Sequence, residues 1–182
     1  RTGKTAARSV GIEVESRLAE HFKKNRLKVF RDIQQLRTTF DVITLFHVLE
    51  HFADPVCLLK KLAKKIGRQG EIIVEVPNAD DALLTLYKCD PFTRFTYWSC
   101  HLYLFTEKTL AMVADKAGLK INYIKQYQRY PLSNHLYWLS HGKPGGHKKW
   151  HFLDSKTLHD AYQKSLAAQG CCDTLIGSFS VK

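Results

Sequence analysis

The sequence predicts an α/β fold: a doubly wound, mostly parallel sheet with an antiparallel strand at its end. Residues 40–78 give strand, loop, helix, turn and strand in succession, which is one βαβ unit with a right-handed crossover. Strand and helix patterns also alternate along the rest of the chain, and two strand patterns, over 119–129 and 173–181, come late. These observations favour a central sheet with helices packed on it.

The central unit has clear boundaries. Residues 40–46 are apolar and β-branched without polar alternation, which predicts a strand buried on both faces. Asp54 has the chemistry of a helix N-cap, and Pro55 stands at the first helical position, where its missing N–H costs nothing. Gly67 is expected to cap this helix in a left-handed conformation, and residues 71–76 form the second strand.

Other elements follow from shorter patterns of the same kind. Because ligands bind beyond the carboxyl ends of parallel strands, we expect a site near the segments that follow the two strands of the central unit, 47–54 and 77–81. Short strands are predicted over 10–14 and 27–30. Helices are predicted over 16–25, 106–117 (closed by Gly118) and 155–168. The stretch that ends at residue 151 is predicted to be irregular.

Length and composition are those of an ordinary globular protein. The 182 residues can bury one core, so one domain is expected. No apolar run reaches the roughly 18 residues that span a bilayer, and no secretory signal precedes the first strand, so we expect no membrane partner. The five cysteines form no CxxC pair, which favours a reduced, cytoplasmic location.

The net charge of +11 leaves a second class of function open. A basic protein can bind nucleic acid, and residues 143–150 (KPGGHKKW) form a compact basic and aromatic cluster. The other lysines are spread over helix faces, as solvated surface usually is. A non-catalytic basic binding module therefore remains the alternative, with nucleic acid as the less favoured partner.

Four stretches together resemble class I S-adenosylmethionine-dependent methyltransferases, in the branch that acts on small molecules. They are VGIEVES at 10–16, the aspartate Asp32, FDVITLFHVLEHFADP at 40–55 and GEIIVEVPN at 70–78. The later LYLFTEKTLAMVADKAGLKI at 102–121 is similar to the family's segment after the sheet. The resemblance spans roughly residues 10–123. It implies a Rossmann-like fold, S-adenosyl-L-methionine as cofactor and methyl transfer by in-line displacement.

The resemblance also implies which residues hold the cofactor. Glu13 matches the carboxylate that accepts hydrogen bonds from the ribose hydroxyls. Asp32 would accept from the adenine amino group, and Ile33 would pack on the adenine ring. Phe46 and His47, at the end of the next strand, would line the methionine side. The alternative for each of them is an exposed residue at a strand end.

One feature of the family does not appear in the sequence. The family's first strand and its glycine-rich E/DxGxGxG loop lie upstream of the ribose carboxylate, and only 12 residues precede Glu13. We therefore expect a single truncated methyltransferase domain over 1–182. Either another copy of the chain fills the place of the missing strand, as a homo-oligomer, or the neighbouring strands close the gap. The missing loop argues against cofactor binding, and so against activity, by this chain alone.

Methyl transfer to a hydroxyl group requires that the acceptor oxygen and the methyl group be aligned, and a general base that takes up the proton helps the reaction. His101 is the first candidate, because in the family its segment approaches the acceptor, and His47 is the second. A histidine packed among aromatic side chains is the alternative for His101. Glu50 and His51 are expected to fix the loop before the Asp54 cap.

Residues 131–153 are predicted to form an acceptor-side insertion or lid. This region combines aromatic, amide and basic side chains, which suit a sugar or a phosphate-bearing acceptor such as a nucleotide-sugar. The alternative is an ordinary surface insertion. The predicted acceptor-binding residues are Arg129, Asn134, His135 and Trp138, with Tyr137 and Trp150 as further aromatic platforms.

The central unit also contains a literal HxxEH, from His47 to His51, which is the inverted zinc-protease motif. Two histidines four residues apart share one face of a helix and could hold zinc. This chemistry requires the motif to lie inside a helix, whereas here it follows directly on a strand. A zinc hydrolase is therefore the least favoured alternative, and no metal is expected.

Overall fold

The computed structural model describes residues 8–182, and the chain divides into two compact units, Arg1–Phe40 and Asp41–Lys182. The first unit contains β1 (Gly11–Ile12), β2 (Val29–Phe30) and short helices: η2 (Ser16–Leu18), α1 (Ala19–Lys24) and η3 (Ile33–Gln35). β1 and β2 pair in parallel, with Gly11 opposite Val29. Both strands are shorter than predicted. The predicted helix begins as a 3₁₀ turn, because the carboxylate of Glu15, and not Ser16, caps it.

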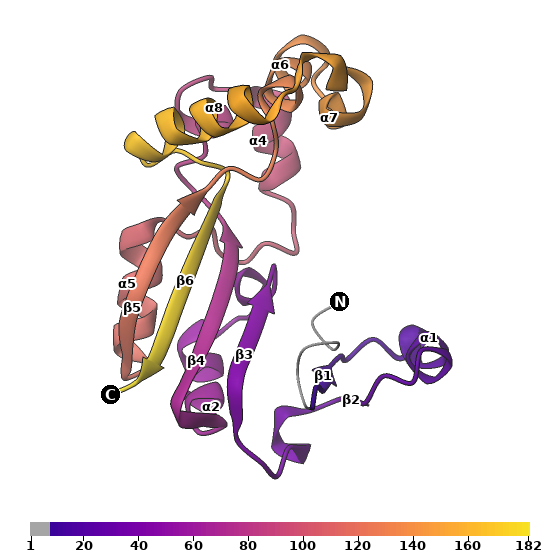
Figure 1. Cartoon of the computed structure of the whole chain (residues 1–182), viewed down its shortest axis with the longest axis vertical. Coiled ribbons are helices and arrows are strands. Elements are labelled where there is room, and N and C mark those ends of the chain that lie inside the picture. The colour runs from indigo at the N-terminus through magenta and orange to yellow at the C-terminus, as the bar shows by residue number, and fades with distance from the viewer. Residues whose placement is uncertain (1–7) are drawn as a thin grey trace. The chain divides into compact units, whose positions relative to one another are not determined.

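The second unit is built on a four-stranded sheet in the order β3-β4-β6-β5. Its strands are β3 (Phe40–Phe46), β4 (Ile66–Pro77), β5 (Leu119–Tyr127) and β6 (Thr174–Val181). β6 is antiparallel to both of its neighbours, and the arrows of β3, β4 and β5 point the same way (Figure 1). The βαβ unit, the mostly parallel sheet and the late antiparallel strand are therefore as predicted.

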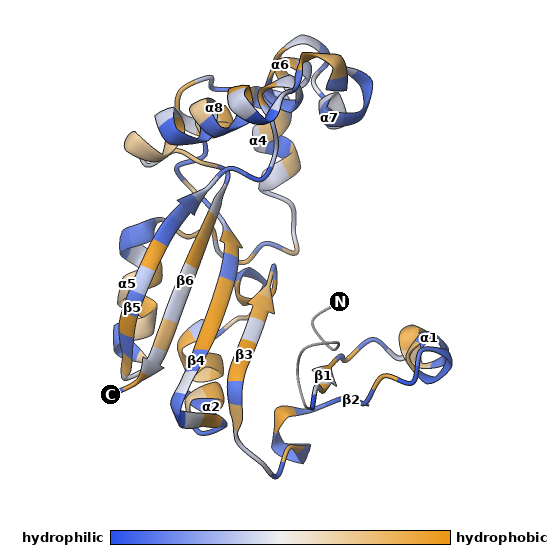
Figure 2. Ribbon diagram, in the orientation of Figure 1, coloured by the Kyte–Doolittle hydropathy of each residue, from blue (hydrophilic) through white to orange (hydrophobic). Residues whose placement is uncertain are grey.

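Two helices pack against this sheet and against each other, α2 (Pro55–Ala63) and α5 (Glu107–Lys116). Each begins where its cap residue predicts: Asp54 accepts from the backbone N–H of Cys57, and Thr106 from that of Thr109. The apolar side chains between the helices and the strands form the core, and Figure 2 shows hydrophobic segments in these strands, with hydrophilic segments between them in β3, β4 and β5. The fully buried members include Leu59, Ile72, Val74, Leu110, Leu119, Leu175 and Phe179.

The remaining helices gather beyond the carboxyl ends of β4 and β5 (Figure 1). They form a cap over that edge of the sheet, in which α8 lies where a helix over 155–168 was predicted, with Ser155 as its N-cap. No helix among residues 8–182 is long and apolar enough to cross a membrane. The cap consists of α3 (Ala82–Thr85), α4 (Asp90–Thr96), α6 (Leu132–His141), α7 (Gly146–Lys149), η5 (His151–Leu153) and α8 (Lys156–Ala168).

Three predictions about these elements were wrong. β3 is not buried on both faces: Val42 is 50% and Phe46 51% exposed, because β3 is the edge strand of its sheet. Gly67 does not cap α2, which ends at Ala63 with Lys64 as its cap, and it lies inside β4 instead. The stretch up to residue 151 is helical rather than irregular.

Closure of the gap by the neighbouring strands stays a prediction, because those strands belong to different units. In the described residues, β1 and β2 form a two-stranded sheet of their own, and β3 has only β4 as a partner. A strand contributed by another copy of the chain stays a prediction.

Candidate active site

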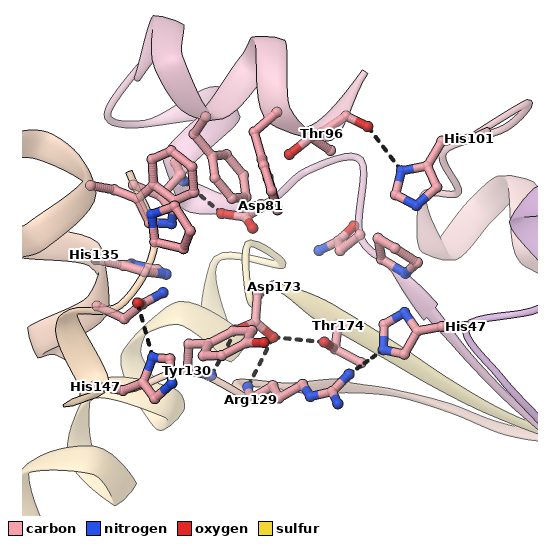
Figure 3. A pocket seen from close by; sticks show the side chains of 18 residues that line it. His47, Asp81, Thr96, His101, Arg129, Tyr130, His135, His147, Asp173 and Thr174 are labelled. Atoms are coloured by element: carbon pink, nitrogen blue, oxygen red, sulfur yellow. Dashed lines mark hydrogen bonds between the residues drawn. The ribbon is translucent and has the colours of Figure 1, made fainter. Parts of the chain in front are cut away.

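A cavity of about 320 Å³ lies at the edge of the sheet where β3, β4 and β5 end and β6 begins. Strand-end residues form its floor, and residues of α4 and α6 form much of its wall (Figure 3). The lining side chains are His47, Pro77, Asn78, Asp81, Leu83, Phe92, Phe95, Thr96, His101, Arg129, Tyr130, Asn134, His135, Trp138, Pro144, His147, Asp173 and Thr174. Ligand cavities of α/β proteins are expected at this edge.

Asp173 organises the floor of the cavity. Its carboxylate accepts hydrogen bonds from the backbone N–H groups of Arg129 and Tyr130, both at 2.9 Å, and from the hydroxyl of Thr174 at 2.7 Å. The side-chain amide of Gln128 donates to it as well, at 3.0 Å. Burial raises the pKa of Asp173, and these donors oppose the shift. The carboxylate thereby fixes the turn at which the chain leaves β5.

A second chain of hydrogen bonds joins the floor to the helical cap. The Nε2 atom of His135 lies 3.2 Å from the amide nitrogen of Gln128, and its Nδ1 lies 2.8 Å from the hydroxyl of Tyr162, which contacts Tyr87 in turn. An amide nitrogen only donates, so Nε2 accepts and Nδ1 bears the proton. Burial lowers the pKa of His135 to about 4. The ring is therefore neutral at pH 7.

His47 ends β3 in a left-handed backbone conformation with φ of 52°. Its backbone N–H donates to the carbonyl oxygen of Glu75 on β4, and its ring lies 3.1 Å from the Glu75 carboxylate. The guanidinium of Arg129 hydrogen-bonds Nε2, while Nδ1 lies 3.4 Å from Glu50. The contact with Glu50 raises the pKa of His47, against burial and the charge of Arg129.

His101 and His51 are each oriented by a backbone carbonyl group. Nδ1 of His101 lies 2.8 Å from the oxygen of Thr96, and Nδ1 of His51 lies 2.6 Å from that of Cys100. A carbonyl oxygen only accepts, so Nδ1 carries the proton in both rings. In each neutral ring, Nε2 then keeps a free lone pair.

Asp81 lies at the amino end of α3 and is 3% exposed. Its Oδ1 accepts from the backbone N–H of Leu83 at 2.7 Å, and its Oδ2 has no hydrogen-bond partner among the described residues. Burial raises the pKa of Asp81 to about 7, and the nearby Asp173 adds to the shift. Asp81 is thus a cavity-lining carboxyl group that changes charge near neutral pH.

The predicted lid is a packed helical unit. The side-chain oxygen of Asn134 accepts from the backbone N–H groups of Gly145 and Gly146, which ties α7 to α6. Trp138 packs edge-on against Phe92 of α4, with ring centroids 5.1 Å apart, and is 3% exposed. Three neighbouring aromatic rings, of Tyr137, His141 and Trp150, pack on one another.

The structure brings together all six residues predicted to be catalytic or acceptor-binding. His47, His101, Arg129, Asn134, His135 and Trp138 all line the cavity. Tyr137 and Trp150, predicted as further aromatic platforms, do not line it. Sequence reasoning missed Asp81 and Asp173 as individual residues, although Asp81 ends the segment 77–81 where a ligand was predicted.

The predicted cofactor residues are divided between the two units. Glu13 and Asp32 follow the parallel strands β1 and β2, so both carboxylates lie beyond the same edge of that pair. One oxygen of Glu13 accepts from the backbone N–H of Glu15, and the other has no hydrogen-bond partner among the described residues. Asp32 caps η3, and Ile33 is half-buried. Two acceptors beside an apolar side chain fit the hydroxyl and amino groups of a nucleoside.

The HxxEH motif does not lie on a continuous helix. His47 follows β3 with positive φ, and η4 is a single 3₁₀ turn, Leu49–His51. The two histidines of the motif therefore do not share a helix face, and the zinc-protease interpretation fails on geometry.

Comparisons with known proteins agree with this architecture. The family described as a methyltransferase domain matches residues 3–124. No curated protein matches the chain. A SAM-dependent methyltransferase from Thermotoga maritima superposes with a TM-score of 0.58 at 16% identity, over 96% of this chain and 73% of its own.

Two archaeal structures are similar as well. A SAM-dependent methyltransferase from Archaeoglobus fulgidus gives a TM-score of 0.56 at 14% identity, over 94% of this chain and 75% of its own. A Haloferax volcanii protein in complex with a methyltransferase activator gives a TM-score of 0.61 at 11% identity, over 96% of this chain and 72% of its own. At these identities the structures support the fold class alone.

Proposed function

Because this chain belongs to the methyltransferase-domain family, whose cofactor is S-adenosyl-L-methionine, we propose that it methylates a hydroxyl group of a small polar acceptor held in the cavity at the strand ends. The acceptor class that fits best is a sugar or a nucleotide-sugar. The convergence of His47, His101, Arg129, Asn134, His135 and Trp138 on one cavity is the observation that supports this proposal.

The size and lining of the cavity suit an acceptor of this class. About 320 Å³ is at the small end of ligand sites, which is room for a single ring and its substituents. Phe92, Phe95 and Trp138 offer aromatic surface to the apolar face of a sugar ring. Asn134, His147 and Asp81 add polar side chains to the lining of the same cavity. The guanidinium of Arg129 is the group that could pair with a phosphate, because it binds two oxygens at once.

The cofactor, when bound, supplies a methyl group activated on a sulfonium. The protein must then align the acceptor oxygen, exclude water and take up one proton. We propose His101 as the group that takes the proton: the Thr96 carbonyl holds its Nδ1–H and leaves the Nε2 lone pair available. We assign His47 a positioning role: its ring is fixed between Glu75 and Arg129 and would orient the acceptor at the carboxyl end of β3. Asp81 is a second proton acceptor on the wall.

The cofactor-binding residues remain those proposed from the sequence. Glu13 and Asp32 would bind the ribose and adenine polar groups, with Ile33 against the ring. Phe46 and His47, at the end of β3, would line the methionine side. The support for this assignment is that Glu13 and Asp32 follow neighbouring parallel strands.

Cofactor and acceptor binding are tested separately. Titration calorimetry with S-adenosylhomocysteine tests whether this chain binds the cofactor without the glycine-rich loop, and any binding should be weakened by Glu13→Gln and by Asp32→Asn. Transfer of a labelled methyl group is then measured over free monosaccharides and nucleotide-sugars. The same assay is repeated with Arg129→Gln, Trp138→Leu and His101→Asn.

Arg129→Gln should raise KM for nucleotide-sugars and leave KM for phosphate-free sugars unchanged. Trp138→Leu should raise KM for both, and His101→Asn should lower kcat by about 10²-fold, as for loss of a general base. The exposed His151 provides the matched control, and His151→Asn should change nothing. Equal effects of Arg129→Gln on both acceptor classes would remove the nucleotide-sugar assignment.

A further inference from the structure

Glu50 is a buried carboxylate that lacks the hydrogen bonds such a group normally requires. It is 0% exposed, and neither of its oxygens has a hydrogen-bond partner among residues 8–182. Two histidine nitrogens lie near its Oε1 atom: Nδ1 of His47 at 3.4 Å and Nε2 of His51 at 3.9 Å. An uncompensated buried charge costs several kcal/mol. The imidazole of His47 can offset this charge in part, and a cation beside Oε1 would complete the compensation.

Two histidines beside Glu50 are arranged to offer nitrogen lone pairs. His51 and His101 each give their Nδ1–H to a backbone carbonyl, of Cys100 and of Thr96, which leaves Nε2 free. Metal-ligating histidines usually show this arrangement, because a hydrogen bond on one ring nitrogen fixes the orientation of the other. The two rings are neighbours, with centroids 5.1 Å apart.

One ligand atom from each of Glu50, His51 and His101 lies within 4.8 Å of the other two. We propose that these three residues bind a divalent transition-metal ion, with the Glu50 carboxylate as the anionic ligand. In a tetrahedral zinc site, bond lengths of about 2.0–2.1 Å put neighbouring ligand atoms roughly 3.4 Å apart. The three side chains thus need only a small contraction to close on an ion.

The ligand set selects the class of metal. Two imidazoles and one carboxylate suit zinc, iron(II), cobalt and manganese, whereas magnesium and calcium prefer oxygen ligands throughout. Three protein ligands leave at least one coordination position open. That position belongs to water or to a ligand oxygen, since His101 also lines the cavity.

The backbone already holds the three ligands together without an ion. The carbonyl oxygen of Glu50 accepts from the N–H groups of Leu102 at 3.0 Å and Tyr103 at 3.2 Å. The segment carrying His101 is thereby fixed on η4, which carries Glu50 and His51. A preformed site loses little conformational entropy on binding an ion.

Metal binding is independent of the acceptor class proposed above, but it bears on the role of His101. An ion would occupy the Nε2 lone pair that a general base needs. With a metal bound, His101 would be a ligand, and Asp81 would be the remaining proton acceptor on the wall. Metal binding is therefore measured directly, so that its result does not depend on methyl transfer.

The test is titration of zinc into the full chain after treatment with a chelator, followed by calorimetry and by competition with a chromophoric chelator. We expect one zinc ion per chain, with manganese weaker and magnesium not bound. Glu50→Gln, His51→Ala and His101→Ala should each weaken zinc binding by at least about 10²-fold, more than loss of an outer-shell partner costs. His151→Ala is the matched control, because Nδ1 of His151 also donates to a carbonyl oxygen but no such cluster surrounds this histidine among the described residues.

Two further measurements separate metal binding from loss of folding and from binding to thiols. Each variant is melted without metal, and only variants that fold as the parent does are compared. Cobalt is then substituted for zinc: nitrogen and oxygen ligation gives no sulfur charge-transfer band, and Cys100→Ser, next to the site, should leave the affinity unchanged. No zinc binding by the parent chain, equal binding by Glu50→Gln, or a sulfur band would each overturn the proposal.

Discussion

Gly146 lies so close to Ser133 that a Cβ at position 146 would be 2.2 Å from the carbonyl oxygen of Ser133. The same Cβ would also meet the backbone of Asn134 at 2.6 Å. α7 and α6 are therefore in backbone contact, at a place where only glycine fits.

Gly146→Ala should disrupt the packing of α7 on α6. Overpacking costs about 1–3 kcal/mol, and we expect the upper end because the clashing atoms belong to the backbone. Urea denaturation measures this cost. The matched control is Gly11→Ala in β1, whose Cβ would make only ordinary contacts, the nearest at 3.5 Å. Equal stabilities of the two variants would contradict the close packing.

Asp81→Asn should stabilise the protein at alkaline pH and not at acid pH. The folded-state pKa of about 7 lies above the ordinary value of 3.8, so the native state favours the protonated carboxyl group. The contribution of Asp81 to the free energy of unfolding is fully present below about pH 4 and is lost as the pH rises through 7. Asparagine keeps an oxygen for the Leu83 N–H and carries no charge. Relative to the parent protein, the free energy of unfolding of the variant should rise by about 1.4 kcal/mol per pH unit between about pH 4 and about pH 7. Above about pH 7 the difference between the two proteins should stay constant.

The measurement is the free energy of unfolding of both proteins at pH 4, 5.5, 7 and 8.5. Only the difference between them matters, because other groups titrate in both. A difference that does not change with pH would show that Asp81 ionises normally in the folded protein.

Tyr162→Phe should destabilise the cap by about 1–2 kcal/mol. The substitution removes the hydroxyl that accepts from Nδ1–H of His135 and leaves that buried N–H without a partner. Tyr87→Phe removes only the outer contact of the same chain, at a side chain that is 39% exposed, and should cost less. Thermal unfolding ranks the two variants, and the reverse order would contradict the assigned position of the proton on His135.

Asp173→Ala should be among the most destabilising single changes at the cavity. Four donors, from Gln128, Arg129, Tyr130 and Thr174, lose their acceptor, and we expect a cost of about 2–4 kcal/mol. Asp115→Ala is the matched control, since Asp115 is exposed and its ion pair in the described part of the chain is with Lys182. It should change stability by less than about 0.5 kcal/mol. Chemical denaturation of both variants decides the matter.

The starts of α2 and α5 could be predicted from the sequence because one capping residue decides each of them, whereas η2 is capped by Glu15 rather than by the expected Ser16. Asp54, Thr106 and Ser155 each place a side-chain oxygen next to a backbone N–H, and α2, α5 and α8 begin there. α6 was missed for the opposite reason. Its buried face carries polar residues, Ser133, Asn134 and His135, whose partners come from distant segments, so its pattern is not that of an apolar stripe.

The site could be predicted where it depends on parallel strands. The segments that follow β3 and β4 were expected at a ligand site because parallel strands end at one edge, whereas Arg129, which follows β5, was predicted only as a neighbour of the acceptor-side insertion. Asp173 was not predicted, because it precedes a strand, and only the antiparallel direction of β6 brings that end to the same edge. Glu50 and His51 were expected to fix a loop. Their proximity to His101 depends on the path of residues 97–103, which no local pattern sets.

The positive φ of His47 has a consequence for how ligands are bound. A residue with a Cβ avoids this region of backbone space, so the strand end must hold it there at a cost of order 1–3 kcal/mol. The ring is consequently set by the main chain as well as by its contacts with Glu75 and Arg129. A ligand arriving at this edge would find the imidazole already in place, so that little ordering entropy is lost on association.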